Sequence, residues 1–171
     1  PEMSRGLGDV YKRQILNQYF DCQVAAIKNH GGEVLKYMGD GLLAVFPIDE
    51  YVGDSQQVCA RVLEAARETR SGVEAMQYKI GDTIERFRFG VALHVGHILY
   101  GNIGGGSRLD FTCIGPAVNH AARLEKLTGK MHRTIVASEG FAGICGGGWH
   151  DLGEFPIAGF SRAQRVYGMH D

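Results

Sequence analysis

Two polar residues with the potential for chemistry, Asn119 and Arg123, lie four positions apart in the stretch from Leu109 to Glu125, LDFTCIGPAVNHAARLE. This stretch passes from a β-like segment into a predicted helix, where residues i and i+4 share one face. An amide beside a guanidinium above such a turn favours binding of an oxyanion or a phosphate. For these two residues alone, a solvated helix face is the better interpretation. The same helix offers apolar residues for a buried side: Val118, Ala121, Ala122, Leu124 and Leu127.

A second segment adds a carboxylate. Gly39-Asp40-Gly41 separates two apolar runs, and Asp-Gly between such runs predicts a tight β-hairpin because the turn needs positive φ angles. Asp40 at the hairpin tip could bind a hard cation such as Mg²⁺. The alternative is that Asp40 is only a favourable turn residue. Lys36, four residues earlier, would by itself be interpreted as a surface lysine.

Together these segments resemble the catalytic domain of the class III nucleotidyl cyclases, the family of adenylate and guanylate cyclases. The resemblance runs from about Ile15 to the C-terminus and rests on motifs in family order: KxxGDG at residues 36–41, RFGVALHVGH at 88–97 with GNIG after it, and FTxIGPAVNxAARLE at 111–125. Each motif alone is moderately specific, but their order and spacing are very specific.

The resemblance implies an adenylate cyclase of the bacterial type, which converts ATP to 3′,5′-cyclic AMP and pyrophosphate. In this family the 3′-hydroxyl attacks the α-phosphorus, assisted by two Mg²⁺ or Mn²⁺ ions. Asp40 matches one of two metal-binding carboxylates, Arg123 matches the arginine that stabilises the transition state, and Asn119 matches the residue that orients the ribose. Lys36 and Thr112 match the positions that read the purine. A lysine only donates hydrogen bonds, so it favours N1 of adenine over the N1–H of guanine.

The hydrophobic periodicity predicts an α+β fold with helices on one face of a mainly antiparallel sheet. The family's fold, a ferredoxin-like βαββαβ core with added closing strands, fits this order. The predicted helices cover residues 15–30, 55–76, 116 onward and 139–144, the last capped by Ser138. The predicted strands cover a hairpin at 33–46, a long strand at 86–102 with His94 and His97 on opposite faces, strands at 109–114 and 134–137, and two closing strands within 149–167; residues 80–85 are a predicted connector.

The sequence departs from the family in two places. Residues 1–14 carry neither a strand pattern nor a family motif, and they resemble a non-native leader, such as adaptor read-through, or a disordered one. We therefore expect residues 15–171 to be a cyclase domain that lacks the family's first strand, with its other metal-binding Asp, and to be inactive in this form. Ala158 also stands where many members carry a phosphate-binding lysine, with Arg162 nearby. The alternative function is a catalytically dead module that dimerises or binds nucleotide.

Composition is compatible with a globular catalytic domain. The 171 residues are 44% hydrophobic and 22% charged, and 18 Lys and Arg against 19 Asp and Glu give a net charge of −1, so the sequence indicates no nucleic-acid partner. No apolar run is long enough for a membrane span, and four scattered cysteines indicate thiols in the reducing cytoplasm. The resemblance further implies a homodimer with shared active sites and an upstream sensor or membrane domain.

Overall fold

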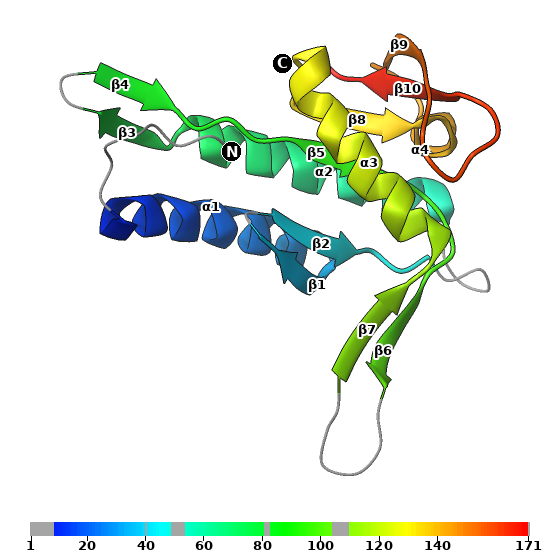
Figure 1. Ribbon diagram of the computed structural model, residues 1–171, viewed down its shortest axis with the longest axis horizontal. Helices are drawn as coiled ribbons and strands as arrows, with labels where there is room; N and C mark the ends of the chain where they lie inside the picture. Colours follow the sequence, from blue (N-terminus) through cyan, green and yellow to red (C-terminus); the bar gives the residue numbers. More distant parts are fainter. Residues whose placement is uncertain (1–8, 40, 49–53, 81–82, 104–109, 171) are drawn as a thin grey trace. The chain divides into compact units, whose positions relative to one another are not determined.

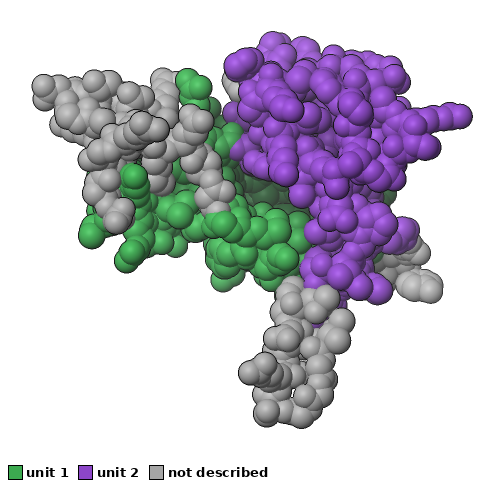
Figure 2. All heavy atoms as spheres, in the orientation of Figure 1, with its two compact units in different colours: residues 1–89 green, residues 90–171 purple. Residues whose placement is uncertain are grey.

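The computed structural model describes residues 9–39, 41–48, 54–80, 83–103 and 110–170 (Figure 1). The chain divides into two compact units, residues 1–89 and residues 90–171 (Figure 2). The described strands are mainly antiparallel, as the sequence predicts, and the pair β5–β8 is the parallel exception among them.

The first unit contains two helices, α1 (Asp9–Asn29) and α2 (Ser55–Glu74), which pack against each other. Asp54 caps α2, because its side chain accepts a hydrogen bond from the backbone N–H of Gln56 at 3.0 Å. Aromatic and aliphatic side chains close the core of this unit, where the Tyr19 ring lies 4.7 Å from that of Phe87. The buried cluster consists of Ile15, Tyr19, Val73 and Phe87.

Helix α1 begins six residues before the predicted start at Ile15. Tyr11 explains the difference, because it lies four residues before Ile15 and packs against the same core cluster, which extends the apolar stripe by one turn. Of the predicted leader, residues 1–8 lie outside the described residues, whereas residues 9–14 form the first part of α1.

The hairpin predicted over residues 33–46 is confirmed. Strand β1 (Glu33–Met38) pairs antiparallel with β2 (Gly41–Val45), and Met38 lies opposite Gly41. Gly39 has a φ of +61°, which favours glycine, as the predicted turn requires. The predicted connector at residues 80–85 is wrong, because β3 (Gln77–Ile80) and β4 (Thr83–Arg86) form a second hairpin.

The second unit is built on a four-stranded sheet in the order β5-β8-β10-β9, formed by β5 (Val91–Leu93), β8 (Ile135–Ser138), β10 (Gln164–Gly168) and β9 (His150–Phe155). Helix α3 (Pro116–Met131) contacts β5 and β8, and the short helix α4 (Glu139–Ile144) contacts β8 and β10. Leu124 of α3 is fully buried in a cluster with Val136, Ile157 and Val166. The α3–β5 and α3–β8 contacts fix which face of α3 remains exposed.

The long strand predicted over residues 86–102 is wrong, because two separate strands replace it. Strand β5 ends at Leu93 and pairs with β8, whereas β6 (Leu99–Ile103) pairs with β7 (Asp110–Ile114) in a separate hairpin. Residues 94–98 between them are not in a strand. Gly96 lies so close to α3 that a Cβ atom on it would stand 2.5 Å from Cβ of Ala117. The chain therefore leaves the sheet to follow the helix.

All four cysteines are thiols, of which Cys59 and Cys145 are buried and Cys22 and Cys113 are half-buried. None of the helices in the described part of the chain combines the length and apolar character needed to cross a bilayer.

Candidate active site

The start of α3 depends on one glycine. Gly115 is the N-cap residue with a φ of +149°, and Pro116 follows at the first helical position, where its fixed φ is favourable. A Cβ on Gly115 would lie 2.9 Å from the carbonyl oxygen of His97. The strand-to-helix turn therefore needs glycine at position 115, because it passes directly over the backbone of residues 97–98.

Replacing Gly115 with alanine should lower the free energy of unfolding by about 2 kcal/mol, because both the φ angle and the close carbonyl oppose a side chain. Gly129 is the matched control within the same helix, since a Cβ there meets nothing within 4 Å. Gly129→Ala should raise the free energy by about 0.5–1 kcal/mol through helix propensity. Urea denaturation of both variants measures the difference, and equal effects would contradict this account of the turn.

Asn119 and Arg123 lie one turn apart on the exposed face of α3, as predicted. Neither side chain makes a hydrogen bond or an ion pair with another described residue. The opposite side of the helix is buried through His120, Leu124 and Thr128. Ala122, which the sequence assigned to the buried side, is exposed. An unpaired amide and guanidinium on one helical face are therefore available to a ligand or to a partner chain.

Of the other predicted site residues, two lie in strands of different units and one lies outside the described residues. Thr112 lies in β7, where its backbone is paired with Gly101, three residues before the turn into α3. Lys36 is exposed on β1 opposite Leu43. Asp40 lies outside the described residues. Thr112, Asn119 and Arg123 belong to the second unit, and Lys36 belongs to the first.

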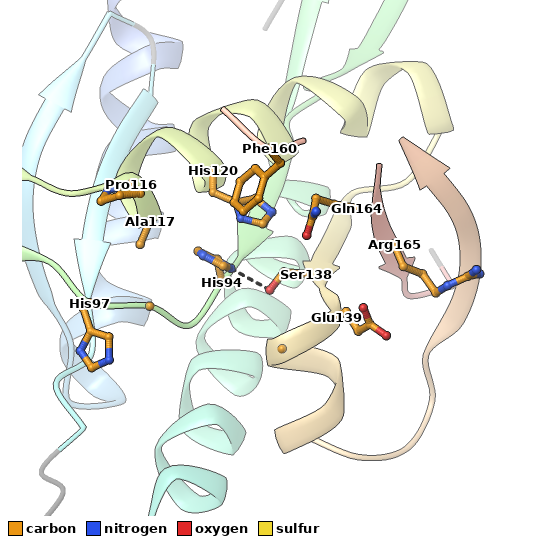
Figure 3. A pocket seen from close by; sticks show the side chains of 12 residues that line it. His94, His97, Pro116, Ala117, His120, Ser138, Glu139, Phe160, Gln164 and Arg165 are labelled. Carbon is orange, nitrogen blue, oxygen red and sulfur yellow. Dashed lines mark hydrogen bonds between the residues drawn. The ribbon is translucent and has the colours of Figure 1, made fainter. Parts of the chain in front are cut away.

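A cavity of about 620 Å³ lies beside the first turn of α3 (Figure 3). Two histidine rings in its wall form a tilted stack, in which the ring centroids of His94 and His120 are 4.1 Å apart and the ring planes are inclined by 38°. Phe160 packs with its edge against His120 at 4.9 Å. On the other side, Nδ1 of His94 lies 2.8 Å from Oγ of Ser138 and shares a hydrogen bond with it. Ser138 also accepts the N–H of Phe141 and so caps α4, as predicted.

Both imidazoles favour the neutral form. Burial, with the neighbouring His120 ring as a second cause, lowers the pKa of His94 to about 4. Burial also lowers the pKa of His120. The stacked rings are therefore uncharged near neutral pH.

Acid should destabilise the second unit through His94. The unfolded chain takes up a proton near the ordinary histidine pKa of 6.5, whereas the folded His94 does so only at about 4, so stability is lost as pH falls between these values. We expect a loss of about 1–2 kcal/mol by pH 4.5, reduced from the full linkage value because the ring is only half-buried. Urea denaturation at pH 7 and pH 4.5 should show a smaller loss in His94→Asn than in the wild type.

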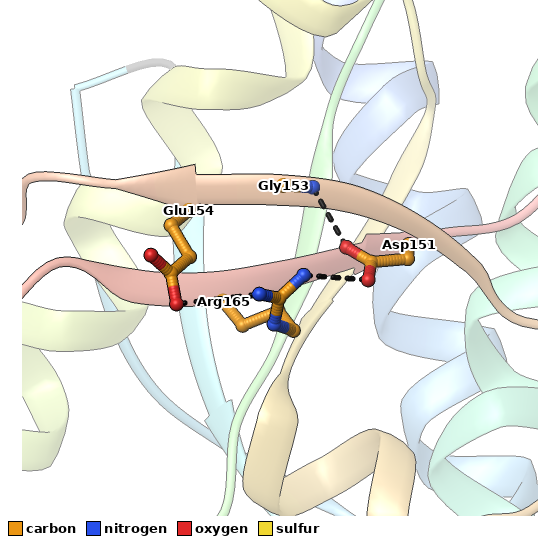
Figure 4. A network of polar contacts seen from close by, with 4 residues as sticks. All are labelled: Asp151, Gly153, Glu154 and Arg165. Carbon is orange, nitrogen blue, oxygen red and sulfur yellow. Dashed lines mark hydrogen bonds and ion pairs between the residues drawn. The ribbon is translucent and has the colours of Figure 1, made fainter.

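The loop between β9 and β10 carries the predicted departure from the family. Ala158 and Arg162 are both exposed in it. Arg165 in the cavity wall is engaged elsewhere, because it donates to Asp151 at 2.6 Å and to Glu154 at 3.3 Å (Figure 4). The backbone N–H of Gly153, together with Arg165, lowers the pKa of the Asp151 carboxyl. Arg165 is therefore held on the β9–β10 surface.

Sequence reasoning missed His94, His120 and Phe160 as neighbours in one cavity. The stack joins the segment after β5 to α3 and to the β9–β10 loop, and the hydrogen bond to Ser138 spans 44 residues. One signal was available, because His120 lies four residues before the apolar Leu124 and therefore on the same side of the helix.

Comparisons with known proteins agree with this architecture. The chain is 33% identical to an adenylate cyclase of Anabaena cylindrica over 138 residues, which is 80% of this chain and 27% of that protein. It resembles the structure of a bacterial light-regulated adenylyl cyclase with a TM-score of 0.77 and 26% identity, covering 96% of this chain and 46% of the other. Its fold also matches the guanylyl cyclase Cya2, with a TM-score of 0.61, 23% identity, and 95% and 82% coverage. No family model matches the chain.

The fold is thus that of a nucleotidyl cyclase catalytic domain. The chain belongs to the class III nucleotidyl cyclases of the bacterial type, and the resemblance seen in the sequence is confirmed. It spans about a quarter of the length of the curated relative from Anabaena cylindrica.

Proposed function

We propose that this domain cyclises ATP to 3′,5′-cyclic AMP with release of pyrophosphate. The observation that carries the proposal is the pair Asn119 and Arg123, exposed and unpaired among the described residues, one turn apart on the helix that follows the glycine-capped turn. A guanidinium free of protein partners can place its fork of donors on phosphate oxygens. The adenylate cyclase from Anabaena cylindrica supports the choice of reaction.

Each residue has one role in this proposal. Arg123 donates to the charge that develops on the α-phosphate oxygens, and Asn119 hydrogen-bonds the ribose so that its 3′-hydroxyl is in line with the leaving pyrophosphate. Lys36 donates to N1 of adenine, and the Thr112 hydroxyl accepts from the 6-amino group.

A metal-assisted reaction needs carboxylates for Mg²⁺ or Mn²⁺. Among residues 9–39, 41–48, 54–80, 83–103 and 110–170, no three His, Cys, Asp or Glu side chains gather into a site that could hold a metal ion. The chemistry of the donors still fits, because Asp40 follows the confirmed β1 strand and a hard cation takes its remaining ligands from triphosphate oxygens and water. Two such ions would supply Lewis-acid stabilisation of the phosphate charge.

We also propose that the domain works as a homodimer in the cytoplasm, with Asn119 and Arg123 of one subunit serving the metal-binding hairpin of the other. An exposed apolar pair supports a partner surface, because Leu99 of β6 and Ile114 of β7 lie opposite each other and are 72% and 52% exposed. An upstream sensor or membrane domain would then control the dimer in the full-length protein.

The test is a cyclase assay of the full-length protein with ATP or GTP in the presence of Mg²⁺ or Mn²⁺. We expect cyclic AMP to form at least tenfold faster than cyclic GMP. Faster formation of cyclic GMP would contradict the assignment of Lys36. Nucleotide binding without turnover would instead favour the non-catalytic module, for which Ala158 in place of a phosphate-binding lysine is the supporting observation.

A further inference from the structure

The first turn of α3 is held from one side by the segment that follows β5. Along this segment, Gly96 brings the backbone within direct contact of Ala117, since a Cβ on Gly96 would stand 2.5 Å from Cβ of Ala117 and 3.3 Å from Nε2 of His94. His94 then stacks on His120, one turn further along the helix. Asn119 lies between these two contact points in the same helical turn.

The His94 ring is also anchored to the sheet, through Ser138. Ser138 is the last residue of β8, 3% exposed, and its hydroxyl both caps α4 and hydrogen-bonds Nδ1 of His94. The backbone of His94 follows directly after β5, and its side chain is hydrogen-bonded to Ser138 of β8, the strand that pairs with β5. A displacement of the His94 ring would therefore break either its contact with His120 or its hydrogen bond with the Ser138 hydroxyl.

His120 is held by ring contacts and not by a hydrogen bond of its Nε2 atom to another described residue. The residue is 6% exposed, and its Nε2 atom is buried with no hydrogen-bond partner among the described residues. A phenylalanine could make the same ring contacts without burying an unpaired ring nitrogen. The His120 ring also contacts Phe160 of the β9–β10 loop, so it packs against two flat rings.

We propose that His94 and His120 are positioning residues for Asn119. Their stacked rings, tied to Ser138, hold the first turn of α3 so that the Asn119 side chain keeps one position when it orients the ribose of the nucleotide. The proposal rests on the cyclase function given above. It adds two residues that act through Asn119 rather than on the substrate.

The first test measures how firmly the turn is held and does not depend on catalysis. In His94→Ala and His120→Ala, backbone amides 118–122 should exchange hydrogen at least fivefold faster than in the wild type, whereas amides in the last turn of α3 should be unaffected. His97→Ala is the matched control, because this exposed histidine borders the same cavity and its side chain makes no hydrogen bond or ring contact with a described residue. Unchanged exchange in both alanine variants would overturn the proposal.

The second test is kinetic and uses the full-length protein. The two alanine variants should lose about tenfold in kcat with KM for ATP within twofold, because misplacement of Asn119 affects the reacting geometry more than binding. His120→Phe keeps a flat ring against His94 and Phe160 and should retain kcat within threefold. If an alanine variant does not fold, His94→Asn or His120→Leu replaces it with the same expectation. His94→Asn keeps a polar partner for Ser138 but lacks the ring. His120→Leu fills the volume without a flat ring.

The outcomes separate the two levels of inference. A wild-type protein without turnover would overturn the cyclase function and this proposal with it. An active wild type whose alanine variants keep normal kcat would overturn only the positioning role. Faster exchange together with lower kcat in both alanine variants, and neither change in His97→Ala, would support it.

Discussion

Replacing Arg123 with alanine should lower cyclase turnover about a hundredfold or more while leaving KM for ATP within about twofold. The guanidinium is exposed on α3 and makes no hydrogen bond or ion pair with other described residues, so its removal leaves no buried partner unsatisfied and should not affect folding. Its effect should appear only where charge develops on phosphate oxygens, which is in the transition state. Steady-state kinetics of the full-length variant measures both constants.

Two further variants make this result specific. Arg123→Lys keeps the positive charge but loses the planar fork of donors, so it should recover only part of the lost turnover. Lys126→Ala removes an exposed cation from the same helix, three residues further on, and should leave turnover within twofold. Near-normal turnover in Arg123→Ala would remove the role assigned to Arg123, and an equal loss in Lys126→Ala would indicate a general charge effect.

The elements that could be predicted from the sequence are those with local signals. The Asp-Gly pair predicts the β1–β2 hairpin, Pro116 marks the start of α3, and Ser138 caps α4 through its own hydroxyl. Each signal acts over a few residues, so its structural consequence does not depend on the rest of the fold. The same holds for the exposed face of α3, because the i, i+4 spacing alone places Asn119 and Arg123 together.

The elements that could not be predicted depend on contacts between distant segments. Residues 86–102 carry a strand-like pattern, yet the chain leaves the sheet after Leu93 because Gly96 packs directly against Ala117 of α3. A glycine in an apolar run indicates a close approach, but it does not reveal the partner. For the same reason the His94–His120 stack was missed, since it exists only once β5 has paired with β8 beneath the helix.

Lys36 and Thr112, which we propose read the purine, belong to different units of the chain. Lys36 is exposed on β1, and Thr112 is in β7. Their chemistry nevertheless makes a sharp prediction. Adenine presents an acceptor at N1 and a donor at its 6-amino group, whereas guanine presents a donor at N1 and an acceptor at O6.

Exchanging the donor at position 36 for an acceptor and the acceptor at position 112 for a donor should therefore exchange the preferred nucleotide. Lys36→Glu with Thr112→Lys places an acceptor at guanine N1–H and a donor at O6, and should shift the ratio of kcat/KM for ATP over GTP by about a hundredfold or more toward GTP. Lys36→Glu alone should lose ATP turnover because the carboxylate faces an acceptor. Lys28→Glu, an exposed change on α1, is the control for added negative charge in the same unit and should leave the ratio unchanged. If the double variant keeps the ATP preference of the wild type while its urea midpoint shows it to be folded, Lys36 and Thr112 do not read the base.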